Sequence, residues 1–229
     1  MKNYVPLPVY EDLAARWLAN YDAANYSDQG LAARVLKGTH AVLERPFGAD
    51  TQFDQVLEIG AGTLAHLPSI RHGFTRYIAS DGDLAVVESN RSKSLPRGVE
   101  LQHLIGEKLP FADDTFDRLI ATHVLEHIVH PHRALEEWVR VVKPGGVISL
   151  ILPCDPGMAW RLGRHLGPRR SGNAAGLPYD YYMAREHVNS IFGLKEIVKF
   201  HFPKRREAWW PMGVPLPDLN LIYCGNYWV

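Results

Sequence analysis

The order of apolar and helix-forming segments predicts an α/β fold: a doubly wound, mainly parallel seven-stranded sheet with a C-terminal antiparallel hairpin and an N-terminal helical cap. Five short apolar runs alternate with helix-length segments, near residues 54–59, 75–80, 99–105, 116–121 and 147–152. A glycine turn directly follows the first run, as at the edge of nucleotide-binding sheets. Two β-rich runs near the end, residues 195–202 and 219–229, would close the sheet as an antiparallel pair.

The N-terminal part of the chain predicts the helical cap. Helical spacing of apolar residues runs from Tyr10 to about Leu43 and is interrupted at residues 25–30. Within the core, the clearest helix spans residues 132–142 and carries a single apolar stripe. A Pro-Gly-Gly turn at residues 144–146 ends this helix and returns the chain to the sheet.

The segment after the fifth predicted strand is rich in Arg, Gly and Pro, which predicts an irregular insert up to about residue 178. A short helix over residues 184–191 then precedes the two closing runs. We therefore expect a single domain over residues 1–229 with three parts: a cap (1–50), a cofactor-binding core (51–155), and a substrate-side insert with the closing strands (156–229).

Composition limits the class of protein. Twenty-five Lys and Arg residues balance twenty-five Asp and Glu residues, so no overall field favours nucleic acid or an anionic membrane. Cys154 and Cys224 lie seventy residues apart, which indicates free thiols rather than a disulfide framework. The N-terminus lacks an apolar signal core and no apolar run reaches membrane-spanning length, so we expect a cytoplasmic protein without nucleic-acid or membrane partners.

The turn after the first predicted strand is suited to a nucleotide-like cofactor. Four residues form this turn directly after the strand: Gly60, Ala61, Gly62 and Thr63. Glycine lets a cofactor approach the backbone closely, and a helix-capable segment, residues 64–71, follows at once. We expect Glu58 to face the same crevice. Asp81, nineteen residues after Gly62 at the end of the second strand, could accept hydrogen bonds from both ribose hydroxyls.

Further segments follow in a fixed order, at residues 109–111, 116–120, 124–127 and 142–146. With the glycine turn and Asp81, they make the chain similar to the class I S-adenosylmethionine-dependent methyltransferases, in particular the small-molecule group. The resemblance implies S-adenosylmethionine as cofactor and methyl transfer to oxygen or nitrogen of a small-molecule substrate. Two alternatives stay open: a catalytically silent methyltransferase-like binding subunit and, less favoured because of the terminal hairpin, a nicotinamide-dependent dehydrogenase.

The same resemblance implies roles for individual residues. Gly60 and Gly62 would line the methionine and ribose portion of the cofactor, Glu58 would act near its charged amino end, and Asp81 would hold the ribose hydroxyls. The predicted cofactor-binding set is Glu58, Gly60, Ala61, Gly62, Thr63, Asp81, Gly82, Ile105, Gly106, Glu107 and Thr122.

Two positions of that prediction carry alternatives. Ile105 stands where the family often has a carboxylate for the adenine amino group, so backbone amides and apolar contact would hold adenine there, with Glu107 as an alternative carboxylate. N-terminal helices commonly cover the cofactor in this family. Tyr26 would then be a residue of such a cover, or simply part of a surface loop.

His123 is the predicted catalytic residue. It follows the fourth strand, at the edge where ligands bind in open α/β sheets, and an unperturbed histidine, with a pKa of about 6.5, suits proton removal from an acceptor. Residues 123–127 also match the His-x-x-Glu-His pattern of zinc proteases. That pattern requires both histidines on one helix, whereas His123 follows a strand, so no metal is expected. We expect His127 to be a packed helix residue beside the crevice.

The insert carries a basic cluster within ten positions: Arg161, Arg164, His165, Arg169 and Arg170. The cluster is either a solvated loop or, if it folds over the crevice, a site for a carboxylate or phosphate on the acceptor. Three tyrosines that follow could supply a flat wall for a ring or sugar, namely Tyr179, Tyr181 and Tyr182. The acceptor's identity and the oligomeric state are left open by the sequence.

Overall fold

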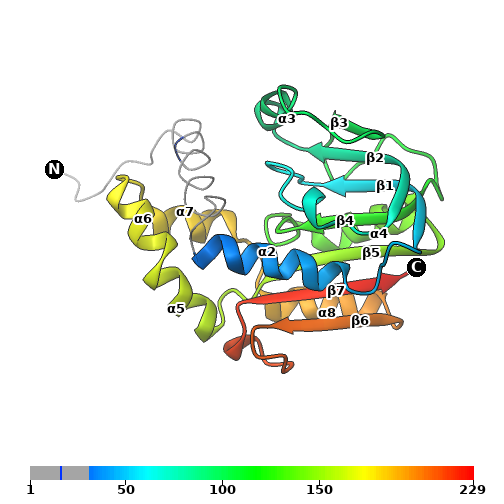
Figure 1. Cartoon of the computed structure of the whole chain (residues 1–229). Helices are drawn as coiled ribbons and strands as arrows, with labels where there is room; N and C mark the ends of the chain where they lie inside the picture. Colours follow the sequence, from blue (N-terminus) through cyan, green and yellow to red (C-terminus); the bar gives the residue numbers. More distant parts are fainter. Residues whose placement is uncertain (1–15, 17–30) are drawn as a thin grey trace.

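The computed structural model describes residue 16 and residues 31–229. One seven-stranded sheet organises the molecule, in the order β3-β2-β1-β4-β5-β7-β6 (Figure 1). Its strands are β1 (Gln52–Ile59), β2 (Gly73–Asp81), β3 (Val99–His103), β4 (Phe116–Thr122), β5 (Val142–Pro153), β6 (Arg205–Trp210) and β7 (Ile222–Trp228). Strands β1 to β5 pair in parallel, and β7 is antiparallel to both β5 and β6. The predicted fold class and its terminal hairpin are confirmed.

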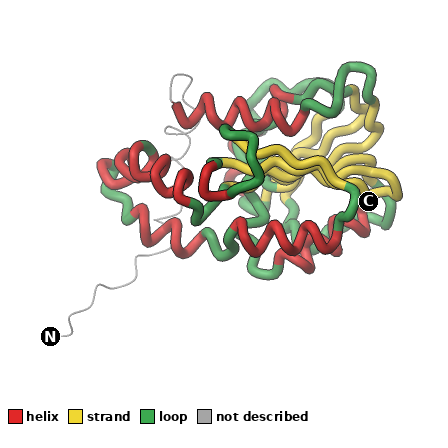
Figure 2. Tube along the Cα trace, turned by 90° about the horizontal axis from the view of Figure 1, so that it is seen from below, coloured by secondary structure: helices red, strands yellow, loops and turns green. Residues whose placement is uncertain are grey.

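Helices cover both faces of the sheet, which Figure 2 shows nearly edge-on. They are α2 (Leu31–Glu44), α3 (Leu84–Asn90), α4 (Pro131–Val141), α5 (Met158–Leu166), α6 (Pro168–Ala174), α7 (Tyr179–Glu186) and α8 (Ile191–His201), with short 3-10 turns η1 (Leu67–Ser69) and η2 (Pro217–Leu219). None of the helices among the described residues combines the length and apolar character needed to cross a membrane. Tyr10 and Tyr26 lie outside the described residues.

Alternation along the strands divides the buried residues into two cores, because successive side chains of a strand point to opposite faces. One core joins the sheet to α4 and α8, with members that include Leu57, Leu119, Leu150, Trp138 and Leu194. The other joins the sheet to α2, with members that include Val56, Ile120, Ile151 and Leu43. Glu58 lies two residues after Val56 on β1, so its side chain points to the same face as Val56, the α2 face. Cys154 and Cys224 are both buried free thiols, as predicted.

The sequence-based assignment of residues 195–202 to a strand is wrong. This segment belongs to helix α8, and the sixth strand is β6, which begins at Arg205. The Ser190 side chain caps the helix by accepting from the Gly193 N–H. Buried Ile191, Leu194 and Val198 recur at helical spacing, so the helical period outweighs the β-rich composition.

Two further assignments are corrected. Residues 156–178 are not irregular, because α5 and α6 occupy most of this segment, with Gly167 as the boundary between the two helices. The helix expected over residues 184–191 lies earlier, as α7, and residues 187–190 leave it. Gly and Pro here mark helix ends instead of a long loop.

The segment after the glycine turn is also not the expected helix. Residues 64–71 hold only a turn and η1, and Leu64 adopts a positive φ of 65°. A left-handed residue cannot continue a right-handed helix, so the chain turns away before a full helix can form.

Candidate functional site

The carboxyl ends of β1, β2 and β4 meet at one edge of the sheet, because these strands are parallel and adjacent. The predicted residues of the glycine turn follow β1, Asp81 ends β2, and Thr122 ends β4, with His123 next to it. Crevices at such edges are where open α/β sheets bind ligands. The structure therefore brings these predicted residues to a common edge.

The two glycines of the turn have different reasons to be glycine. Gly60 has a φ of +66°, and a Cβ added there would lie 2.3 Å from Cγ2 of Val124, in the loop after β4. Gly62 has a φ of +51°, but a Cβ added there would meet no atom of the described residues within 4 Å. Gly60 thus serves close packing between two loops, while Gly62 leaves backbone open to a ligand.

Asp81 holds the turn in place. One carboxylate oxygen accepts the Gly62 N–H at 3.0 Å, and the other accepts the Asp83 N–H at 2.9 Å. The Ala61 N–H donates to the Ser80 carbonyl at 2.8 Å, which ties the turn to β2 a second time. Each carboxylate oxygen keeps further lone-pair capacity, so Asp81 can orient the turn and still accept from a ligand hydroxyl.

Glu58 does not face the open crevice as expected. Its side chain is buried on the α2 face, and the Tyr77 hydroxyl donates to its Oε2 at 2.7 Å. Among the described residues, Oε1 has no hydrogen-bond partner. Burial raises the pKa of Glu58 more than the neighbouring His66 and Tyr77 lower it. A buried carboxylate oxygen without a donor is suited to a positively charged or hydrogen-bonding ligand.

The loop after β3 reaches the same edge. The Leu104 N–H donates to the Asp81 carbonyl at 3.0 Å, and Trp138 Nε1 on α4 donates to the Gly106 carbonyl at 2.8 Å. Ile105 is 62% exposed and Glu107 is also exposed. The loop is therefore anchored by its backbone and presents the Ile105 and Glu107 side chains outward, as expected if backbone groups hold the adenine.

His123 occupies a constrained position after β4. Its φ is +58°, and its N–H donates to the Ile151 carbonyl at 2.9 Å. Its Nδ1 lies 3.6 Å from Oε1 of the buried Glu126, while its Nε2 has no partner among the described residues. Non-glycine residues with positive φ concentrate at functional sites. His123 and His127 both lie in turns, so neither the helical zinc arrangement nor the expected helical position of His127 is found in this part of the chain.

A buried polar chain under α2 was missed by the sequence analysis. His40 and His66 approach through their Nδ1 atoms at 2.8 Å, and His66 Nε2 lies 3.0 Å from Oε1 of Glu44. Arg118 on β4 donates to both oxygens of Glu44, at 2.6 and 3.1 Å. The signal was present in the sequence, because an arginine inside a predicted buried strand requires a buried partner.

The groups of this buried polar cluster shift one another's pKa values. Burial raises the pKa of Glu44, but the hydrogen bond from His66 and the charge of Arg118 outweigh it and lower that pKa to about 2. Burial, followed by the charges of His66 and His123, lowers the pKa of His40 well below its ordinary value. The Glu44–Arg118 ion pair thus lies buried between α2 and the sheet, and His123 is among the groups that lower the pKa of His40.

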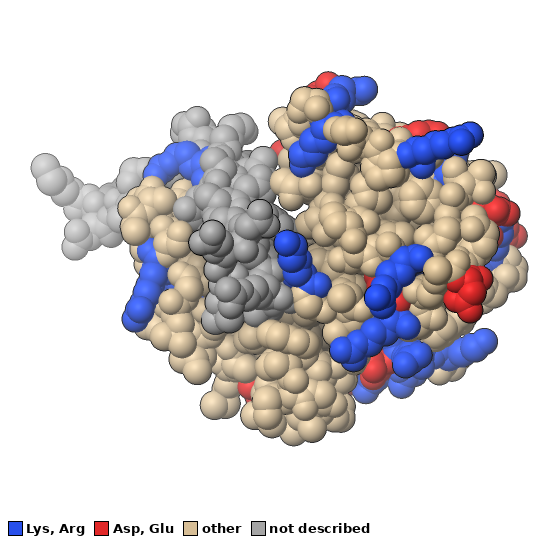
Figure 3. Space-filling view, in the orientation of Figure 1, with Lys and Arg blue, Asp and Glu red and all other residues tan. Residues whose placement is uncertain are grey.

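Much of the predicted basic cluster is paired within the protein. Arg169 Nε donates to Asp180 Oδ2 at 2.8 Å, and Arg164 lies 3.6 Å from both Asp155 and Asp180. Arg161 and Arg170 are exposed. On the face drawn in Figure 3, lysine and arginine side chains occur at several separate places, with acidic ones among them at one end. Most of the predicted tyrosine wall, Tyr179 and Tyr182, is buried.

Comparison with known proteins agrees with this geometry. Residues 57–150 match the family model described as a methyltransferase domain. An uncharacterized methyltransferase of Mycobacterium leprae is 25% identical over 178 residues, which cover 70% of this chain and 66% of that protein. The matched region thus falls just short of two thirds of that relative's length.

Solved structures share the fold over almost the whole chain. A chain in the complex between the Haloferax volcanii Trm112 methyltransferase activator and a putative methyltransferase aligns with a TM-score of 0.63, at 18% identity over 93% of this chain and 95% of that one. An S-adenosylmethionine-dependent methyltransferase from Thermotoga maritima, described as a possible histamine N-methyltransferase, aligns with a TM-score of 0.57, at 16% identity over 96% of each chain. Residues 57–150 of this protein therefore form a methyltransferase domain, and the chain as a whole has the fold of S-adenosylmethionine-dependent methyltransferases.

Proposed function

We propose that this protein transfers a methyl group from S-adenosylmethionine to an oxygen or nitrogen atom of a small molecule. The observation that carries the proposal is the turn at Gly62, which is open on its ligand side and is held by the Asp81 carboxylate at 3.0 Å. A silent binding subunit would have no need of the additional feature at this edge, a histidine whose Nε2 has no partner among the described residues.

The residues present fit the cofactor. Gly62 offers backbone that no described residue covers, and Asp81 retains acceptor capacity for ribose hydroxyls. When bound, S-adenosylmethionine supplies an electrophilic methyl group on a sulfonium. The protein's contribution is then to align the acceptor with that methyl group and to exclude water.

His123 would remove the acceptor's proton. Its Nδ1 faces the Glu126 carboxylate at 3.6 Å, which favours the tautomer that carries hydrogen on Nδ1. Nε2 is then the basic nitrogen, and it is able to accept a proton from a hydroxyl or amine of the acceptor. Glu126 acts in this scheme as a positioning residue.

Replacement of His123 by asparagine tests this role. Asparagine tolerates a positive φ, so the backbone should be retained. We expect turnover to fall about 100-fold, because the proton acceptor is lost, while calorimetric affinity for S-adenosylmethionine stays near that of the wild type. Turnover within a factor of a few of wild type would show that His123 only lines the pocket.

We further propose that the acceptor is anionic. The support comes from exposed Arg161 and Arg170, which lie on α5 and α6 beside the paired Arg164 and Arg169. Guanidinium groups bind carboxylates and phosphates through two parallel hydrogen bonds, which would orient such an acceptor.

A panel of matched acceptors tests both parts of the proposal. The two members of each pair should be identical except that one carries a carboxylate or phosphate group. Transfer of a labelled methyl group from S-adenosylmethionine to each member should be measured. We expect transfer, with a lower KM for the anionic member of each pair. S-adenosylmethionine binding without any transfer would favour the silent subunit. Thermal stabilisation by a nicotinamide cofactor alone would favour the dehydrogenase, since a ligand at a hundred times its Kd stabilises by about 2.7 kcal/mol.

A further inference from the structure

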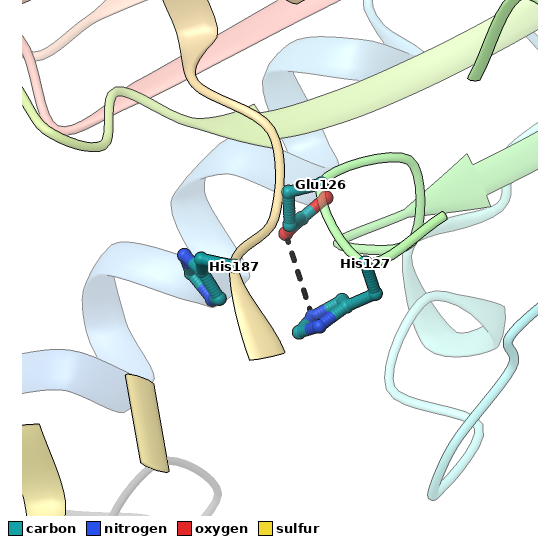
Figure 4. Close-up of side chains that lie close together, drawn as sticks. All are labelled: Glu126, His127 and His187. Atoms are coloured by element: carbon teal, nitrogen blue, oxygen red, sulfur yellow. Dashed lines mark ion pairs between the residues drawn. The ribbon is translucent and has the colours of Figure 1, made fainter. Parts of the chain in front are cut away.

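Two histidines and a glutamate converge beside the catalytic edge (Figure 4). Glu126 and His127 come from the loop after β4, and His187 follows the end of α7. One ligand atom from each lies within 4.8 Å of the other two. Spacing in the sequence could not reveal this group, because His187 lies sixty positions after His127.

Each of the two imidazoles is oriented by a hydrogen-bond acceptor at its Nδ1 atom. His127 Nδ1 lies 3.0 Å from the Glu186 carbonyl, and His187 Nδ1 lies 2.8 Å from Oδ2 of Asp155. A carbonyl can only accept, so His127 carries its hydrogen on Nδ1. A carboxylate favours the same tautomer for His187. Each Nε2 then keeps a free lone pair, which is how histidine ligands of metal ions are held by outer-shell acceptors.

Glu126 supplies the negative charge of the group, and one of its carboxylate oxygens is available to a ligand. Its side chain is only 2% exposed, and its Oε2 has no hydrogen-bond partner in the described part of the chain. A carboxylate and a neutral imidazole are the forms of these side chains that bind metal ions.

The two loops are already fixed to each other. Asn189 donates from its backbone to the Glu126 carbonyl at 3.1 Å and from its side chain to the Ile128 carbonyl at 2.6 Å. The rings of His127 and His187 lie edge to face with centroids 4.9 Å apart. The His127 side chain is 40% exposed, so its ring has room to shift. Small side-chain movements would bring the three atoms to the spacing around one ion, with bonds of about 2.0–2.2 Å.

We propose that Glu126, His127 and His187 bind a divalent transition-metal ion, with Zn²⁺ as the best fit. Two imidazoles and one carboxylate match the three-ligand zinc sites that keep a fourth position for water or a substrate atom. Imidazole ligands disfavour Mg²⁺ and Ca²⁺, which prefer all-oxygen sites. The ion would link the loop that carries His123 to α7. The proposal does not depend on methyl transfer, because the ligands are protein groups alone.

Metal binding should be measured on the full chain without a polyhistidine tag, since a tag would itself bind zinc. After treatment with a chelator and dialysis at neutral pH, titration with Zn²⁺ should show one ion per chain. Co²⁺ should give the visible absorption of a site with nitrogen and oxygen ligands. His187→Asn and His127→Asn should each weaken Zn²⁺ binding at least about 100-fold, and Asp155→Asn should weaken it roughly 10- to 100-fold, as loss of an outer-shell partner does.

His132→Asn is the matched control, because His132 is exposed on α4 only five positions from His127. It should bind Zn²⁺ as the wild type does. Circular dichroism should show that all variants are folded. His127→Asn should disturb the fold least of these variants, since the His127 side chain is 40% exposed. A wild-type chain that takes up neither ion, or a folded His127→Asn with unchanged affinity, would overturn the proposal.

Discussion

Valine in place of Gly62 should abolish S-adenosylmethionine binding in a protein that remains folded. Within the described part of the chain, a Cβ at this position meets no atom within 4 Å, so the new side chain would project into the space proposed for the ligand. The φ of +51° adds strain of roughly 1–2 kcal/mol. We expect calorimetry to show an affinity loss of at least about 100-fold, equivalent to roughly 2.7 kcal/mol.

Gly145→Val controls for the strain. Gly145 also has a positive φ, +80°, with open space around its Cβ, but it lies at the start of β5, at the opposite edge of the sheet. It should lose stability without losing cofactor affinity. Gly60→Val is less informative, because its Cβ would collide with Val124 at 2.3 Å. If Gly62→Val binds S-adenosylmethionine with an affinity within a few-fold of that of the wild type, the turn is not part of the cofactor site.

Replacing Arg118 by methionine should cost the protein a large part of its stability. The Arg118 and Glu44 side chains are both 0% exposed and share two hydrogen bonds. Removing Arg118 leaves the buried Glu44 carboxylate with His66 as its remaining partner, and breaking such a buried ion pair costs about 3–5 kcal/mol. Urea denaturation followed by circular dichroism should show this as a lower midpoint with an unchanged slope.

A double-mutant cycle separates the ion pair from packing. When Glu44→Leu is combined with Arg118→Met, no isolated charge remains, so the double variant should be more stable than Arg118→Met alone. Arg118 also stacks over Phe47 at 4.3 Å, and methionine retains part of that apolar contact. Additive losses in the double variant would mean that Arg118 acts through packing and not through Glu44.

Strands of the core were predictable because their apolar runs are local and continuous. Strands β1, β2 and β4 lie within one or two residues of the predicted runs. The assignment of residues 195–202 failed because Ile197, Val198 and Phe200 suit a strand by composition. Their environment decides otherwise, since Ile191, Leu194 and Val198 pack as one helical face on the sheet.

The sequence by itself determined the edge of the sheet where the glycine turn meets Asp81. A glycine turn at the end of one strand and Asp81 at the end of the next must meet once the strands are parallel neighbours, so local order was enough. Only the tertiary structure decided the pairing of Arg118 with Glu44, seventy-four positions apart, and the approach of His187 to Glu126. Such contacts depend on how α2 and α7 pack in the folded chain. Packing between segments that are far apart in the sequence produces no local sequence pattern from which the contacts could be predicted.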